Sequence, residues 1–218
     1  MNASQRLTLF GSIFILLALV VSYVCAPLFP ITAGWENGWI ENAQVVLLIL
    51  GGVWALRLAA GASHREKVFW QTVAPFWFIF ALRELSWGTV FIEPLSMSPI
   101  TGPVYSSTQQ LWYRPAVVPV MSLILLVCAW RFFRSGQMHT LAILWRQRSI
   151  PLRELLLSAI CMFISASLEG HMMLHFDLSR GAAQVFEESV EFWAYSALLL
   201  AQMRIMMGLR ADASTTMG

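Results

Sequence analysis

Long apolar runs, separated by short polar or proline-containing segments, are the main pattern of this 218-residue chain. Each is long enough to cross a hydrocarbon core of about 30 Å as a helix at about 1.5 Å per residue. The pattern therefore predicts an all-α, six-helix transmembrane bundle that forms one domain over residues 1–210, with a disordered polar tail at 211–218. The predicted spans cover approximately residues 7–29, 39–60, 68–92, 116–133, 152–176 and 184–209.

The polar connections between these runs differ in length. Residues 93–115 form a long, proline-punctuated loop, whereas 134–151 contains a short amphipathic stretch that could lie in the membrane interface as a helix. The first apolar run is too long for the hydrophobic region of a signal peptide, so we expect an uncleaved transmembrane helix there.

The composition supports a lipid-embedded protein. Hydrophobic residues make up 58% of the chain and charged residues only 12%, about half the usual share in a soluble domain. The sequence has no basic stripe, zinc-knuckle spacing or glycine-rich phosphate loop, which argues against nucleic acid and nucleotide as partners. The lipid bilayer is the partner that the composition predicts, and oligomeric state is left open.

Basic residues alternate between the ends of the predicted spans in a way that predicts the topology. With the N-terminus in the cytoplasm, 11 of the 14 Lys and Arg residues fall on the cytoplasmic side, as the positive-inside rule requires. Six spans return the C-terminus to the same side. The cytoplasmic set is Arg6, Arg57, Arg65, Lys67, Arg131, Arg134, Arg146, Arg148, Arg153, Arg204 and Arg210.

Acidic residues gather on the opposite side, where this map places 9 of the 12. Counting from the predicted span ends puts Glu84 roughly 12 Å and Glu191 roughly 10 Å inside the hydrocarbon. Ionised groups at such depth are expected to face the bundle interior and to be paired, protonated or bound to metal. Because adjacent helical residues point about 100° apart, we expect Arg83 to pair with a glutamate of another span rather than with Glu84.

The stretch 169–191 contains two histidines and several glutamates close together in the sequence. His171 and His175 share one helical face, as do Glu187 and Glu191, and a turn between them would place both pairs at matched depths. The spacing suits a divalent metal such as zinc, with these four residues as ligands. Glu41, Arg83, Glu169, Glu187 and Glu191 are expected to line a wider polar pocket, with Glu84 or Glu188 as a general base.

Three motifs carry a resemblance to a known group. ENGWIENAQ at 36–44, RELSWG at 83–88 and FEESVE at 186–191 resemble the ExGxxExxQ, EE(I/L)SWG and EExxE motifs of uncharacterised bacterial multi-pass membrane proteins. The resemblance implies a bacterial inner-membrane location and a shared polar layer, not a particular activity. The sequence departs from the group at Arg83, where an acid is usual, and the two histidines are not a feature of the group.

Three functions fit these patterns. The first is a metal-dependent hydrolase that acts on a lipid or lipid-linked substrate. The second is a proton- or cation-coupled transporter in which carboxylates carry protons, although no internal repeat of the kind found in many carriers is present. The third is a non-catalytic accessory or scaffold subunit whose buried polar residues fix helix packing.

Overall fold

A computed structural model describes residues 3–170 and 176–216 of the chain. About 80% of it is helical, which confirms the predicted all-α class. The chain forms two compact units, unit 1 (Met1–Gly34 with Leu141–Gly218) and unit 2 (Trp35–Thr140), which are described separately below.

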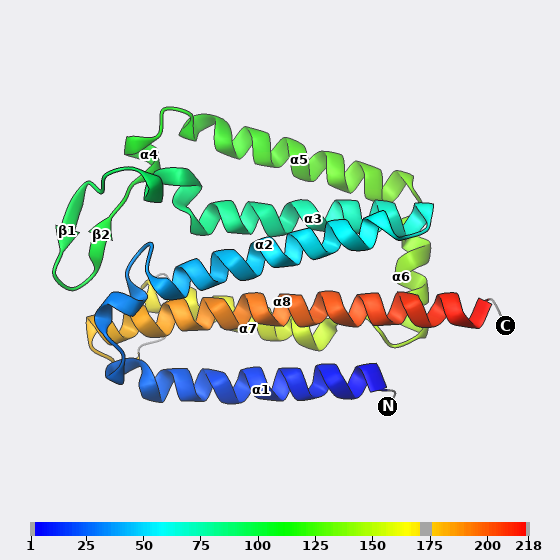
Figure 1. The fold of residues 1–218 in the computed structure, drawn as a ribbon, viewed down its shortest axis with the longest axis horizontal. Helices are drawn as coiled ribbons and strands as arrows, with labels where there is room; N and C mark the ends of the chain where they lie inside the picture. The colour runs from blue at the N-terminus through cyan, green and yellow to red at the C-terminus, as the bar shows by residue number, and fades with distance from the viewer. Residues whose placement is uncertain (1–2, 171–175, 217–218) are drawn as a thin grey trace. The chain divides into compact units, whose positions relative to one another are not determined.

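Unit 1 is built around its longest helix, α8 (Figure 1). Helix α6 (Gln137–Arg146) brings the chain from unit 2 into unit 1. The other elements of unit 1 are α1 (Ala3–Cys25), the 3-10 helices η1 (Ala26–Leu28) and η2 (Ile31–Gly34), α7 (Leu152–Leu168) and α8 (Arg180–Thr216).

Helix α8 packs along both α1 and α7 in unit 1. Trp193 on α8 donates its indole N–H to Ser22 Oγ on α1 at 3.0 Å, and the rings of Tyr23 and Phe186 meet edge to face at 5.3 Å. Gly34 in η2 lies so close to α8 that a Cβ atom there would be 2.6 Å from the backbone nitrogen of Val185. These contacts hold the start of α8 against the end of α1.

Unit 2 is a second helical assembly with a small hairpin at one end (Figure 1). Its elements are α2 (Trp39–Ala60), α3 (His64–Glu84), η3 (Ser86–Phe91), β1 (Ser96–Ser98), β2 (Gly102–Val104), α4 (Ser107–Gln110) and α5 (Arg114–Arg134).

Helices α2 and α3 form an antiparallel pair whose close approach depends on glycine. A Cβ atom on Gly51 would lie 2.7 Å from the ring of Trp77, and one on Gly52 would lie 2.8 Å from the ring of Phe78. Helix α5 packs on α3, and Arg131 donates to the side-chain oxygen of Gln71 at 2.9 Å. The pair α2 and α3 therefore forms the centre of unit 2.

Several helix ends differ from the predicted spans. Helix α3 ends at Glu84 rather than at 92, because Ser86, Trp87 and Gly88 have φ values of 45°, 61° and 106°, which an α-helix cannot contain. The eight residues used to place Glu84 deep in the hydrocarbon are thus not α-helical, and that depth does not hold.

Helix α7 ends at Leu168, before the predicted end at 176, and α8 continues to Thr216. The predicted disordered tail from 211 is therefore helical as far as 216, consistent with the lack of proline or glycine before Gly218. The polar loop 93–115 contains an antiparallel two-stranded hairpin, with Ser96 opposite Val104. The predicted helix within 134–151 is α6.

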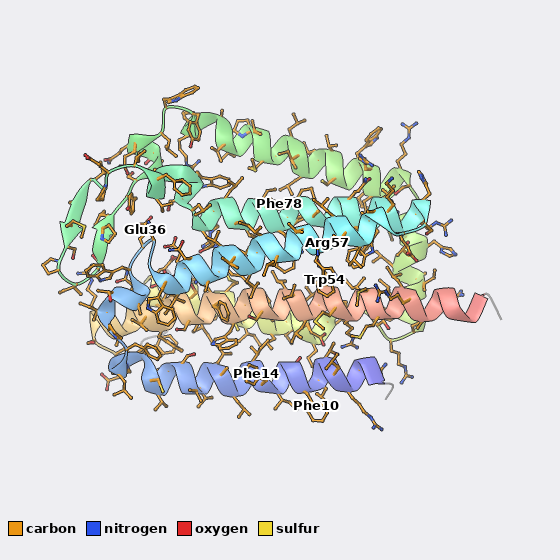
Figure 2. All side chains as sticks on the ribbon, in the orientation of Figure 1. Phe10, Phe14, Glu36, Trp54, Arg57 and Phe78 are labelled. Atoms are coloured by element: carbon orange, nitrogen blue, oxygen red, sulfur yellow. The ribbon has the colours of Figure 1, made fainter. Side chains whose placement is uncertain are left out.

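Four helical segments in the described part of the chain are long and apolar enough to cross a membrane. They are Gln5–Leu28, Ile31–Ala60, Arg114–Arg134 and Arg180–Ala211. Their surfaces carry exposed apolar side chains, including Phe10 and Phe14 on α1, which are 67% and 62% exposed (Figure 2). Such continuous apolar surfaces are unusual in water-soluble monomers and indicate a membrane-embedded protein.

Candidate functional site

The N-terminal end of α2 forms one wall of the candidate site. Glu41 lies in the first helical turn, is only 7% exposed, and accepts a hydrogen bond from the backbone N–H of Asn37. A carboxylate in this position satisfies a backbone donor and interacts favourably with the positive end of the helix dipole. Asn37 has a φ of 61°, in the left-handed region that asparagine tolerates better than most residues.

The C-terminal end of α3 supplies a second buried carboxylate. Glu84 is the last residue of α3 and is 7% exposed. Arg83 donates from Nη1 to Glu84 Oε1 at 3.3 Å, whereas its own side chain is 44% exposed. The long arginine side chain thus reaches its neighbour Glu84 at the helix end, a contact that the sequence analysis did not expect. A pairing of Arg83 with a glutamate of another span remains a prediction.

A left-handed turn at Ser86–Gly88 brings the two predicted motifs of unit 2 together. Ser86 Oγ donates to Glu36 Oε1 at 2.7 Å, which joins the segment before α2 to the segment after α3. The turn is held from outside as well, because the Tyr113 hydroxyl donates to the carbonyl oxygen of Trp87 at 2.7 Å. Residues 36–41 and 83–88 thus form a connected set of polar groups, which we call the glutamate end of unit 2.

Backbone strain accompanies this turn. Positive φ at a serine or a tryptophan costs on the order of 1–3 kcal/mol per residue, and such strain is found preferentially at functional sites. The guanidinium of Arg114 lies over the Trp87 ring, 5.8 Å from its centroid, and helps to fix the strained residue. Gly88 was the only sequence signal for this turn, and the predicted helix ran through it.

The glutamates of unit 1 lie on α8 and at the end of α7. Glu191 is 6% exposed and accepts a hydrogen bond at 2.7 Å from Ser165 Oγ on α7, which is also buried. Glu187 and Glu188 are half-buried on α8, and Glu169 is exposed directly after α7. The α7–α8 contact thus includes one buried carboxylate–hydroxyl pair.

The predicted metal site falls mainly outside the described residues. His171 and His175 both belong to the undescribed segment 171–175. Within residues 3–170 and 176–216, no group of three His, Cys, Asp or Glu side chains is arranged to hold a metal ion. A divalent metal at His171, His175, Glu187 and Glu191 remains a prediction.

The predicted pocket residues are divided between the two units. Glu41, Arg83 and Glu84 belong to unit 2, where the structure connects them to one helix-pair end. Glu169, Glu187, Glu188 and Glu191 belong to unit 1. Convergence of both sets on one pocket remains a prediction.

Two features of the chain were missed by sequence reasoning. Glu36 accepts the hydrogen bond from Ser86, a contact that the sequence analysis did not predict. Glu154 was not among the predicted site residues, although it is fully buried in the first turn of α7 and pairs with Arg153 and Arg204. Its partner on α8 is 50 residues away, and no local pattern signals such a pair.

No protein-family model, no curated protein and no solved structure matches this chain. The resemblance to bacterial multi-pass proteins therefore stays a prediction. The functional proposal therefore rests on the chemistry of the chain's own residues, above all those of the glutamate end of unit 2.

Proposed function

We propose that the chain is an all-α protein that crosses a bacterial inner membrane six times, with both termini in the cytoplasm. Besides the four candidate spans, α3 has 21 residues and α7 has 17, or roughly 31 Å and 26 Å of helix at about 1.5 Å per residue. The distribution of basic residues supports the orientation through the positive-inside rule. The glutamate end of unit 2 would then face the outer side of the membrane.

The proposed activity is hydrolysis of a lipid or lipid-linked substrate at this end. Glu84 would act as a general base that takes a proton from water as the water attacks an ester carbon or phosphorus. The ester C–O or P–O bond would break, and the proton held by Glu84 would pass to the departing alcohol oxygen. The observation that carries the proposal is the position of Glu84, a buried carboxylate beside the more exposed Arg83 and directly before a strained turn. Arg83 would hold an anionic group of the substrate, since its guanidinium is exposed enough to reach one.

Hydrolysis can be tested with full-length protein in proteoliposomes made from radiolabelled bacterial lipids. Products are separated by thin-layer chromatography and identified by mass spectrometry. Glu84→Gln should lower the rate at least about 100-fold, the usual contribution of a general base. Glu93→Gln is the matched control, because Glu93 is an exposed loop carboxylate that should leave the rate unchanged. Equal rates for both variants would refute the role of Glu84.

The metal can be tested separately by elemental analysis of the purified protein. The proposed His171 and His175 ligands predict about one zinc or other divalent ion per chain, and its loss in His171→Ala and His175→Ala. A metal-free parent protein that still hydrolyses lipid would eliminate the metal while leaving the role of Glu84 intact.

A second candidate function is a non-catalytic accessory or scaffold subunit. The Ser165–Glu191 hydrogen bond favours it, because it joins α7 to α8 through two buried groups and gives the carboxylate a role in packing. On this alternative, Glu→Gln substitutions at residues 84 and 191 would change thermal stability without abolishing any lipid turnover. The absence of turnover by the parent protein, with loss of stability in both variants, would favour the scaffold over the enzyme.

A further inference from the structure

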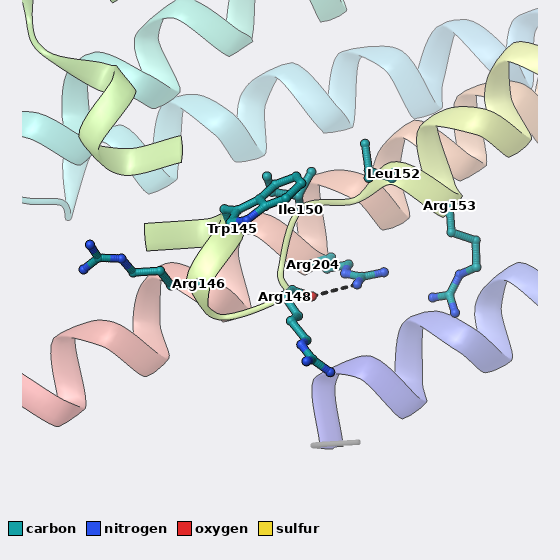
Figure 3. A pocket seen from close by; sticks show the side chains of 7 residues that line it. All are labelled: Trp145, Arg146, Arg148, Ile150, Leu152, Arg153 and Arg204. Carbon is teal, nitrogen blue, oxygen red and sulfur yellow. Dashed lines mark hydrogen bonds between the residues drawn. The ribbon is translucent and has the colours of Figure 1, made fainter. Parts of the chain in front are cut away.

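Unit 1 has an arginine-lined pocket at the end where α7 begins (Figure 3). Its volume is about 620 Å³, within the range of small-molecule sites. Four arginines contribute to its lining: Arg146, Arg148, Arg153 and Arg204.

Three of these side chains lie around one region of the pocket. Figure 3 shows Arg148 and Arg153 extending to the same side of the 148–153 segment, with the guanidinium of Arg204 between them, whereas Arg146 points away. Arg204 Nη2 donates to the backbone carbonyl oxygen of Arg148 at 2.8 Å, which fixes the two residues relative to each other. The Nε atoms of Arg153 and Arg204 are buried and have no hydrogen-bond partner among the described residues.

A buried carboxylate organises this cluster without neutralising it. Glu154 receives hydrogen bonds from Arg153 at 2.6 Å and from Arg204 at 3.1 Å to each of its oxygens. Three guanidinium groups, those of Arg148, Arg153 and Arg204, against one carboxylate leave a surplus of two positive charges in this region of the pocket. A surplus of positive charge in an arginine-lined pocket is what an anion with several oxygen atoms would satisfy.

The backbone at Arg148 is held in a conformation that arginine does not favour. The end of α6 closes with Ser149 N–H donating to the Leu144 carbonyl at 2.8 Å and Arg148 N–H donating to the Trp145 carbonyl at 3.0 Å. This arrangement requires a left-handed residue, usually glycine, and Arg148 has a φ of 53°. Arg148 thus occupies a position, next to the pocket, where glycine is usual. A role of its side chain in the pocket would offset the free-energy cost of the left-handed backbone conformation.

Apolar groups at the pocket favour a lipid over a free anion. Trp145 and Leu152 line the pocket and are 68% and 61% exposed. Tryptophan at the level of lipid headgroups and basic pockets between helices are both typical of lipid contact. A soluble phosphate would gain nothing from these two side chains.

We propose that this pocket binds the phosphodiester headgroup of an anionic membrane lipid, with Arg148, Arg153 and Arg204 as its ligands. The inference depends on the chain being membrane-embedded but not on the proposed hydrolysis, because the pocket contains none of the glutamates of that proposal. Lipid binding here would fix the junction of α6, α7 and α8 against the membrane surface.

The test uses the full chain, purified in detergent, with phosphatidylglycerol added and bound lipid counted by native mass spectrometry. Arg148→Gly should weaken binding about five-fold, the effect of one basic residue near an anionic surface. It should not lower the thermal midpoint, because glycine relieves the left-handed backbone. Arg210→Gln is the matched control: Arg210 is an exposed arginine on α8 outside the pocket lining, and its loss should leave the affinity unchanged.

Glu154→Gln tests the charge argument in the opposite direction. It removes the carboxylate that competes for Arg153 and Arg204, so the affinity for phosphatidylglycerol should rise. A merely structural arginine cluster would show no such gain. Equal affinities for Arg148→Gly and Arg210→Gln, or no gain with Glu154→Gln, would overturn the proposal.

Two further probes identify the source of the phosphate group. Phosphatidylcholine has the same phosphodiester with an added cation, and it should bind more weakly than phosphatidylglycerol. Inorganic phosphate and sn-glycerol 3-phosphate should fail to displace the lipid. Equal binding of phosphatidylcholine, or displacement by either soluble anion, would overturn the assignment to an anionic lipid.

Discussion

Arg204→Gln tests the buried ion pair that joins α7 to α8. The substitution removes both hydrogen bonds from Arg204 Nη1 to the Glu154 carboxylate and the bond from Nη2 to the Arg148 carbonyl. Glu154 has no exposed surface and would keep only Arg153, whose side chain is 37% exposed. Removal of one partner from a buried pair costs about 3–5 kcal/mol, and the remaining Arg153 contact places the expectation near about 3 kcal/mol.

Replacing the carboxylate instead of the arginine should lower the free energy of unfolding by less. Glu154→Gln leaves two arginines without their carboxylate, but both side chains retain some exposure and can turn toward water. We expect a loss of about 1 kcal/mol. In the double variant the two losses should not add, with a coupling of about 1–3 kcal/mol between the residues.

Buried cysteines provide the assay for this prediction. Cys161 on α7 is fully buried, so a thiol-reactive fluorophore reports on unfolding of unit 1 during a temperature ramp in detergent. Cys25 and Cys128 are replaced by serine so that Cys161 is the single reporter. A loss of about 3 kcal/mol corresponds to a fall of about 6–12 °C in the midpoint for a chain of this size.

The matched control is Arg210→Gln on the same helix, which should shift stability by no more than about 0.5 kcal/mol. If Arg204→Gln melts within about 2 °C of its parent, the Glu154 pair does not stabilise the α7–α8 contact. An additive double variant would show instead that both residues act on stability independently.

Two other contacts in unit 1 give predictions of the same kind, read with the same thermal assay. Gly34→Ala should destabilise by about 1–3 kcal/mol because its Cβ would meet the backbone of α8; an unchanged midpoint would contradict the packing. Ser165→Ala removes the hydrogen bond to Glu191 and should cost about 1–3 kcal/mol, whereas Ser196→Ala, which loses only a bond to its own helix, should stay within about 0.5 kcal/mol. No difference between the two serines would show that the buried hydroxyl contributes little.

The hydrophobic pattern predicted the helices well because the length of an apolar run is a local property of the sequence. The fold class and the cores of α1, α2, α5 and α8 follow from it directly. The end of α3 was harder to predict, because Ser86 and Trp87 adopt left-handed conformations that serine and tryptophan rarely adopt. The depth predicted for Glu84 therefore rested on a continuous helix that the structure does not have.

The candidate site was predictable only in part, for a related reason. Residue types and spacing identify which glutamates share a helical face, as with Glu187 and Glu191. They do not identify partners from other elements, such as Ser86 for Glu36 or Ser165 for Glu191, because these pairs depend on how helices pack.

The arginines that predicted the topology turn out to have more than one physical role. Arg153 and Arg204 hold a buried carboxylate, Arg131 donates to Gln71, and Arg65 contacts His139 at 3.1 Å. Packing could place these arginines at helix ends without any contribution from membrane insertion. Counts of basic residues per side treat all arginines alike, whether or not their side chains also take part in packing. Topology would therefore be tested best by moving arginines that have no role in packing, such as Arg210, rather than those that hold the helices together.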